Sequence, residues 1–433
     1  MNDIIKKLKD NFLFHASLGS KELFHSNLLA WILEQRNSKG EFEVLRIFIK
    51  TVAKLDVGII TDDNNPIIAR EENKIDLTIK WKGGDKWNLI FIENKMKSIP
   101  TPKQLNEYDG KIDKFLKVKT TLFKGKPEEV KLERKLVVKF LLTPFPSDVN
   151  SNRGDWKNIT YSNQIIEFLN SIMGVDFLNN EDVKFIIEKY ISFLSAQNEI
   201  VRFLNLDDLK KFKNRNYDFY SKLAVENKYE SEELNEESES KEKHFMTDVR
   251  SLRLHDLVLK LAHQKISQLI ENQISTNFEN LIVSDYEEFT KGSKKIFVDH
   301  SFSRGTGIST VSILIKKNQA VSLQLQGDSL RYFAALHGTE SSKNIDFAKQ
   351  LEKNKIWFYD LNGELLSGKG WKNKDVLKIN DSTAFNSYGP NFIYLNKNVS
   401  EYNNKPISEL VDLICGEVKR VVDNFHEFEK LIP

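Results

Sequence analysis

Three charged residues lie at the rim of a predicted β-hairpin. Residues 75–97, IDLTIKWKGGDKWNLIFIENKMK, read as two apolar strands joined by a turn at two glycines. Asp76 begins the first strand, and Glu93 and Lys95 end the second, so antiparallel pairing places the two carboxylates opposite each other. Carboxylates at that distance repel unless a cation lies between them, and Mg²⁺ prefers oxygen ligands. The pattern predicts a magnesium site, beside which Lys95 could orient or help deprotonate a water, or neutralise charge in the transition state.

A surface ion pair on an edge strand is the structural alternative for this Glu–Lys pair. Glu93, however, directly follows the apolar run LIFI. Burying a carboxylate and an ammonium behind such a run is costly unless they pair or bind a metal. The apolar approach and the opposing Asp76 therefore favour the metal site.

The segments KIDLTIKW, LIFIENKMK and PKQLNEY together resemble the PD-(D/E)XK nuclease superfamily, in particular the branch with the motifs I-D, I-E-N-K and Q-L-x-x-Y. The resemblance spans roughly residues 10–200. It implies a restriction-endonuclease-like αβββαβ core and hydrolysis of phosphodiester bonds with Mg²⁺, or with Mn²⁺ as an alternative ion. Asp76 and Glu93 would be metal ligands together with the backbone carbonyl of Asn94, and Lys95 would be the motif lysine. The proline that names the superfamily is absent, because Ile75 precedes Asp76.

Two residues of the next predicted helix also match the family pattern. Gln104 and Tyr108 have the spacing of its Q-xxx-Y motif, and four residues apart they share one helix face. There they could contact the scissile phosphate or hold Lys95. With them, the predicted catalytic set is Asp76, Glu93, Lys95, Gln104 and Tyr108.

Further acids could extend the metal site. Glu22 matches a first-helix glutamate of the same branch, although an acid in a first helical turn also has an ordinary structural explanation. Glu71 or Glu72 could add a ligand, and Glu72 would share a strand face with Asp76 if the strand is unbroken. His25 is expected to be a structural hydrogen-bond partner rather than a base.

The elements that must position these residues follow from the hydrophobic periodicity. The N-terminal half predicts helices, then three strands, a helix, a strand and a strand–helix unit, which gives the αβββαβ order. A strand–helix–strand unit implies a parallel pair joined by a crossover helix. The second half predicts a helix at 248–277, several strands and a final helix at 407–428, an antiparallel α+β pattern.

Composition suggests three segments along the chain. Residues 226–243 are almost purely charged and polar, which is typical of an acidic linker or disordered loop, with a DNA-mimicking tract as the alternative. We therefore predict a nuclease-like domain at 1–225 and an α+β domain at 244–433. The second domain would serve recognition, binding of a protein partner, or formation of a homodimer.

Charge alone does not identify a partner, because the 433-residue chain has a formal net charge of only +2. Locally, Lys97 and the basic stretch 103–139, which contains Lys103 and Lys111, could contact phosphates, or the stretch could simply form a solvated helix face. The single cysteine excludes a disulfide within the chain and a zinc site built from cysteines. No signal peptide or membrane span is expected, so we predict a cytoplasmic protein.

The sequence thus predicts a Mg²⁺-dependent nuclease that acts on DNA, with a role in bacterial defence against foreign DNA suggested by analogy. Two alternatives remain open at this point. One is a catalytically silent scaffold that binds nucleic acid or protein, and the other is an RNA or tRNA nuclease with the same site.

Overall fold

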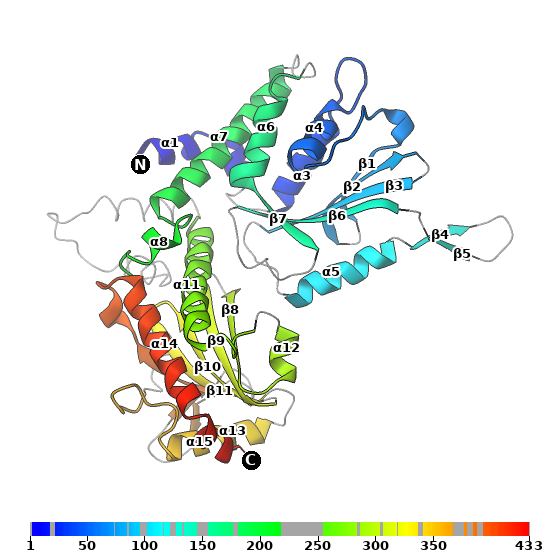
Figure 1. Cartoon of the computed structure of the whole chain (residues 1–433). Coiled ribbons are helices and arrows are strands. Elements are labelled where there is room, and N and C mark those ends of the chain that lie inside the picture. Colours follow the sequence, from blue (N-terminus) through cyan, green and yellow to red (C-terminus); the bar gives the residue numbers. More distant parts are fainter. Residues whose placement is uncertain are drawn as a thin grey trace. The chain divides into compact units, whose positions relative to one another are not determined.

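The chain folds as two compact units in a computed structural model (Figure 1). The described residues up to Asp207, with residues 254–257, form the first unit, and Asp208 to residue 217 and the residues from Val258 onward form the second. The predicted linker at 226–243 and the predicted boundaries beside it lie outside the described residues. The structure describes residues 2–17, 22–72, 74–84, 86–95, 102–115, 117–121, 127–131, 134–144, 155–175, 181–217, 254–283, 286–303, 306–317, 319–336, 341–366, 376–378, 384–387 and 393–432.

A five-stranded mixed sheet is the centre of the first unit. Its order is β1-β2-β3-β6-β7, with antiparallel pairing among the first three strands and parallel pairing among β3, β6 and β7. The strands are β1 (Ile67–Glu72), β2 (Ile75–Gly83), β3 (Lys86–Asn94), β6 (Arg134–Thr143) and β7 (Trp156–Thr160). The predicted hairpin, parallel crossover and restriction-endonuclease-like order are confirmed.

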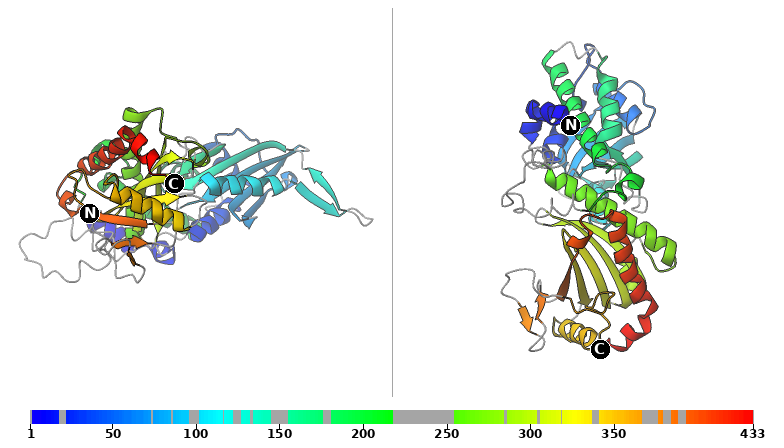
Figure 2. Two further views of the ribbon diagram at one scale, coloured as in Figure 1. Left: turned by 90° about the horizontal axis from the view of Figure 1, so that it is seen from below. Right: turned by 90° about the vertical axis from the view of Figure 1, so that its left-hand side faces the viewer.

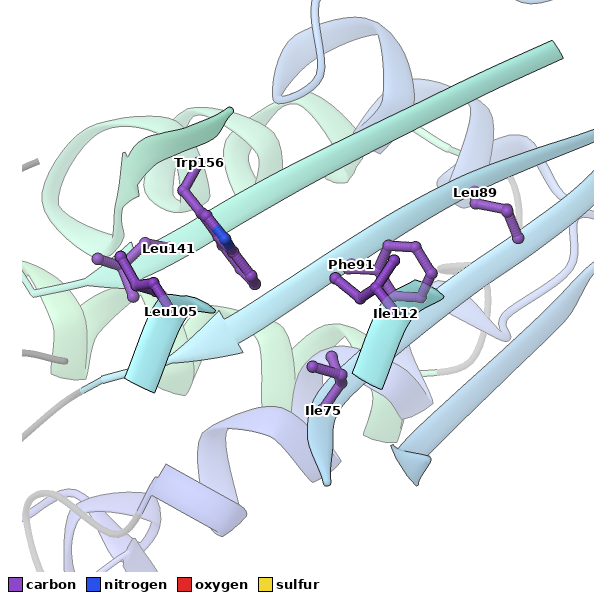
Figure 3. Packing of buried hydrophobic residues seen from close by; sticks show 7 residues of the cluster. All are labelled: Ile75, Leu89, Phe91, Leu105, Ile112, Leu141 and Trp156. Carbon is purple, nitrogen blue, oxygen red and sulfur yellow. The ribbon is translucent and has the colours of Figure 1, made fainter. Parts of the chain in front are cut away.

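Helices cover both faces of this sheet (Figure 1). On one face, α5 (Pro102–Phe115), which connects β3 to β6, packs through Leu105 and Ile112 against the strands. Figure 3 shows the resulting apolar cluster, which also contains Ile75, Leu89, Phe91, Leu141 and Trp156. The other face carries α3 (Glu22–Leu33), α4 (Glu43–Thr51), α6 (Ile166–Ile172) and α7 (Glu181–Phe203).

Smaller elements complete the first unit. Helices α1 (Asn2–Lys9) and α2 (Phe12–Ser17) pack on α7, where Asn11 Nδ2 donates to the Lys189 carbonyl at 2.8 Å. The 3₁₀ turn η1 (Asp62–Asn64) precedes β1, and the π-helical turn η3 (Tyr161–Ile165) joins β7 to α6. A separate hairpin of β4 (Lys117–Thr121) and β5 (Pro127–Lys131) follows α5. This hairpin was not predicted from the sequence.

The second unit contains a fully antiparallel seven-stranded sheet of order β12-β13-β14-β11-β10-β9-β8. This agrees with the predicted α+β pattern. Its strands are β8 (Lys295–Ser303), β9 (Thr306–Lys316), β10 (Gln319–Gln326), β11 (Ser329–Leu336), β12 (Val376–Lys378), β13 (Ala384–Ser387) and β14 (Ile393–Asn398). Its helices are α8 (Leu209–Phe212), α11 (His255–Phe278, whose first residues belong to the first unit), α12 (Tyr286–Lys291), α13 (Ser341–Lys353), η6 (Ser400–Tyr402), α14 (Ile407–Asp423) and α15 (Phe425–Lys430).

Two long helices, α11 and α14, cover one face of the second sheet (Figure 2). On β11, the Tyr332 hydroxyl donates to Glu417 Oε1 of α14 at 2.9 Å. On β9, Ser309 Oγ donates to the His263 carbonyl of α11 at 3.0 Å. No helix within the described residues is long and apolar enough to span a membrane.

A glycine permits the close contact between α11 and β9. A Cβ atom added to Gly307 would lie 2.3 Å from Cδ2 of His263 and 2.9 Å from the Leu259 carbonyl oxygen. Backbone cannot move aside as a flexible side chain can, so this position excludes any larger residue.

Gly307→Ala should therefore destabilise the second unit by about 1–3 kcal/mol through overpacking. Gly416→Ala is the matched control, because its Cβ would meet only Leu361 Cδ1 at 3.5 Å and it lies inside α14. Alanine there should stabilise by about 0.5–1 kcal/mol through helix propensity. Urea unfolding of both full-length variants measures the difference, and equal midpoints would contradict the packing described here.

Candidate active site

The two predicted carboxylates meet at one edge of the first sheet. The β2–β3 register pairs Leu77 with Ile92, which puts Asp76 beside Glu93 at the next position. Glu93 is buried at 2% exposed, and Asp76 is half-buried. The antiparallel hairpin therefore holds two carboxyl groups side by side where the apolar strands end.

Lys95 supplies the positive charge at this edge. Its Nζ lies 2.6 Å from Glu93 Oε1, and its side chain is 13% exposed. Its backbone N–H donates to the Leu142 carbonyl at 2.8 Å, which continues the β3–β6 pairing past the end of β3. The other carboxylate oxygen, Glu93 Oε2, is buried and has no hydrogen-bond partner among the described residues.

The surroundings of Asp76 favour its protonated form in the absence of a cation. Burial raises the pKa of Asp76 to about 7, and the nearby Glu93 carboxylate acts in the same direction. The Asn94 backbone N–H donates to Asp76 Oδ2 at 2.7 Å, and this bond and Lys95 lower the pKa only in part. A bound cation would instead favour the ionised carboxylate.

Lys95 and Tyr108 hold their protons firmly. Burial lowers the pKa of Lys95, but the charge of Glu93 and their hydrogen bond outweigh this, so the pKa rises above its ordinary value. Burial, followed by the charge of Glu93, raises the pKa of Tyr108 to about 12. The Tyr108 ring centroid lies 5.8 Å from Lys95 Nζ and 4.7 Å from Lys111 Nζ. Lys95 is thus a fixed positive charge, which favours charge stabilisation over the role of a base.

The donor set fits a hard divalent cation. The buried Glu93 Oε2 has no hydrogen-bond partner among the described residues. The negative charge of Glu93 also disfavours ionisation of Asp76, and a cation between the two carboxylates would remove this repulsion. Within the described residues, no three His, Cys, Asp or Glu side chains gather closely enough to hold a metal alone. Mg²⁺ commonly takes only one or two carboxylates and completes its shell with water and substrate phosphates, so a pair suffices.

The other predicted site residues have different surroundings. Glu22 opens α3 and lies near enough to raise the pKa of Asp76 by its charge. Gln104 and Lys103 lie in α5, where nothing of their side chains is described, and Lys97 lies outside the described residues. Lys111 is half-buried beside Tyr108.

The strand between Glu72 and Asp76 is broken, so the condition under which the two would share a strand face is not met. Glu72 pairs with Ile75 across a tight turn, so Glu72 ends β1 and Asp76 is the second residue of β2. Positive φ angles at Glu71 (52°) and Lys74 (68°) allow the reversal. Lys80 Nζ lies 2.7 Å from Glu72 Oε1, so this carboxylate has an ion pair of its own.

Sequence reasoning missed the side chain of Asn94 and the residues around it. Strand alternation places this side chain on the face opposite Glu93, and there it donates to Ser26 Oγ at 3.1 Å. His25 of the same helix is fully buried, its Nδ1 lies 2.8 Å from the Tyr190 hydroxyl, and burial lowers its pKa to about 3. His25 is thus a neutral structural residue, as expected.

The comparison with known proteins concerns the first unit. Residues 10–192 match the family model described as the PD-(D/E)XK nuclease superfamily. No curated protein and no solved structure matches the chain. The matched region contains the mixed sheet and the site of Asp76, Glu93 and Lys95. The N-terminal region of residues 10–192 therefore belongs to the PD-(D/E)XK nuclease superfamily.

Proposed function

We propose that this protein is a Mg²⁺-dependent nuclease that cleaves DNA. Superfamily membership indicates a nuclease with a nucleic-acid substrate, and nucleases of this superfamily generally use divalent metal ions. The observation that carries the finer proposal is the arrangement at the sheet edge. A buried, unpartnered carboxylate oxygen of Glu93 lies in the group formed with Asp76 and the cationic Lys95, among the residues that the structure describes.

Asp76 and Glu93 would hold the metal ion, with the backbone carbonyl of Asn94 as a third oxygen. When bound, Mg²⁺ would supply Lewis-acid stabilisation of the phosphate and a more acidic water. Lys95 stays an ammonium and stabilises the negative charge that grows on the phosphate during in-line attack. The Tyr108 hydroxyl stays neutral and could donate a hydrogen bond to the phosphate, and Lys111 beside it offers a phosphate contact.

Retained charged residues and analogy with the superfamily decide among the substrates and roles. A silent scaffold would be expected to lose its charged triad, whereas this chain retains Asp76, Glu93 and Lys95. DNA as the substrate, a cytoplasmic location and a role in bacterial defence are proposed by analogy with the superfamily. RNA cleavage would use the same residues, so both nucleic acids belong in the test.

Purified full-length protein should cleave plasmid or linear DNA in Mg²⁺ and stop in EDTA. Lys95→Met should lower kcat by about 10²–10³-fold, the usual cost of removing one group that stabilises transition-state charge. Asp76→Ala should abolish cleavage, because a metal ligand is lost. Lys50→Met is the control, since Lys50 is an exposed lysine of α4 and its loss should leave the rate unchanged.

Gel assays on DNA and RNA in parallel distinguish the alternatives. Cleavage that survives Asp76→Ala, or that ignores EDTA, would rule out the proposed mechanism. Cleavage of RNA alone would show that the substrate is RNA and that the proposed site is still the catalytic one. Absence of all cleavage, with intact Mg²⁺ binding, would favour the binding scaffold.

Asp76 should also make the stability of the metal-free protein depend on pH. Its pKa of about 7 in the folded protein is above the ordinary 3.8, so folding favours its protonated form. This contribution is complete below the ordinary pKa and is lost as the pH rises through about 7. In EDTA, Asp76→Asn should therefore raise Tm more at pH 8 than at pH 5.

Mg²⁺ supplies the complementary measurement. At pH 8 it should raise the Tm of the wild type and leave Asp76→Asn nearly unchanged, because the ion stabilises only a site that it can bind. Asp63→Asn, an exposed residue of η1, is the control and should show neither effect. A lower Tm for Asp76→Asn in EDTA at pH 8 would show that Asp76 is not destabilising when ionised.

A further inference from the structure

Asn94 contacts both sides of the site through different groups. Its backbone N–H donates to Asp76 Oδ2 at 2.7 Å. Its side-chain Nδ2 donates to the Glu22 carbonyl at 2.9 Å and to Ser26 Oγ at 3.1 Å. Asn94 is only 1% exposed, so leaving its polar groups without these partners would be costly.

These contacts join segments that are far apart in the sequence. Glu93 and Lys95 project from one face of β3, while the Asn94 carboxamide projects from the other face, toward α3. Ser26 Oγ in turn donates to the Glu22 carbonyl at 3.1 Å, which closes a small network around the first turn of the helix. The carboxylate of Glu22 then lies close enough to raise the pKa of both Asp76 and Lys95.

Buried aromatic residues support the carboxamide from behind. Tyr161, the first residue of η3, interacts with Asn94. Asn94 Oδ1 and the Tyr161 hydroxyl are both buried and have no regular hydrogen bond among the described residues. The ring centroids of Tyr161 and His25 lie 5.2 Å apart, and Tyr190 holds His25 by its hydrogen bond. The packing around Asn94 leaves little freedom for the side chain.

We propose that Asn94 is a positioning residue whose carboxamide sets the affinity of the site for Mg²⁺. It fixes the start of α3, and with it Glu22, against the strand end that holds Asp76 and Glu93. This role belongs to the side chain and is separate from the backbone carbonyl as a ligand. The inference rests on the proposed function, since it assumes that the edge of the sheet binds Mg²⁺.

The test compares two buried asparagines of the same strand. Asn94→Ala should weaken Mg²⁺ binding, measured by isothermal titration calorimetry on the full chain, by about 10–100-fold, as is usual for residues that orient metal ligands. Asn88, which is 6% exposed and lies toward the other end of β3, is the matched control. Asn88→Ala should change the affinity by less than about twofold, even if it lowers Tm as much.

A double-mutant cycle identifies the route of the effect. If Asn94 acts by holding Glu22, then Asn94→Ala should weaken Mg²⁺ binding much less in a Glu22→Gln background than in the wild type. Additive effects of the two substitutions would overturn this link to Glu22.

The outcomes separate this inference from the proposed function. A wild type that binds no Mg²⁺ would overturn both. A wild type that binds Mg²⁺ and cleaves, with equal affinities for Asn94→Ala and Asn88→Ala, would overturn only the inference. If Asn94→Ala does not fold, Ser26→Ala removes one acceptor of the carboxamide and should weaken binding by about 2–5-fold. An unchanged affinity for that variant would also overturn the positioning role.

Discussion

The repulsion between two carboxylates at the end of an apolar hairpin is the constraint on which the first unit depends. Glu93 is nearly inaccessible, and Asp76 lies beside it with a strongly raised pKa. A fold gains nothing in stability from such a pair, because desolvation and like charge both oppose it. Lys95 and the Asn94 N–H offset the cost only in part. A cation bound between the two carboxylates would relieve the repulsion that is left.

The surrounding architecture keeps these groups from separating. The paired strands β2 and β3 hold the acids at adjacent positions, and β6 extends the pairing to the backbone of Lys95. Helix α5 returns across the sheet and brings Tyr108 next to Lys95. Asp109 on that helix accepts from Lys139 Nζ at 2.8 Å and from Trp156 Nε1 at 3.0 Å, which ties α5 to β6 and β7. Rigid strands and a pinned helix thus maintain an arrangement that the charges alone would disperse.

Local periodicity made the fold class and the hairpin predictable. Alternation along β3 correctly put Glu93 and Lys95 on one face, and turn geometry placed Asp76 opposite. The same rule does not reach Glu72, because alternation assumes a continuous strand and no glycine marks the reversal between Glu72 and Ile75. The hydrogen-bond partners of the Asn94 side chain could not be predicted from the sequence for a different reason. They depend on how α3 packs against a strand about 70 residues further along the chain, which no local pattern encodes.

The hydrogen bonds from Asn94 to α3 have a consequence for how such a site could be transferred or could arise. The short stretch from Asp76 to Lys95 contains all three charged residues of the site, which suggests that it could function in another protein. The stretch does not form the site by itself, because the two acceptors of the Asn94 carboxamide belong to α3, much earlier in the chain. Grafted into a foreign sheet, the hairpin would bring its repelling acids without the anchor that orients them. Helix and hairpin therefore form one inheritable unit, and changes in either are constrained by the other.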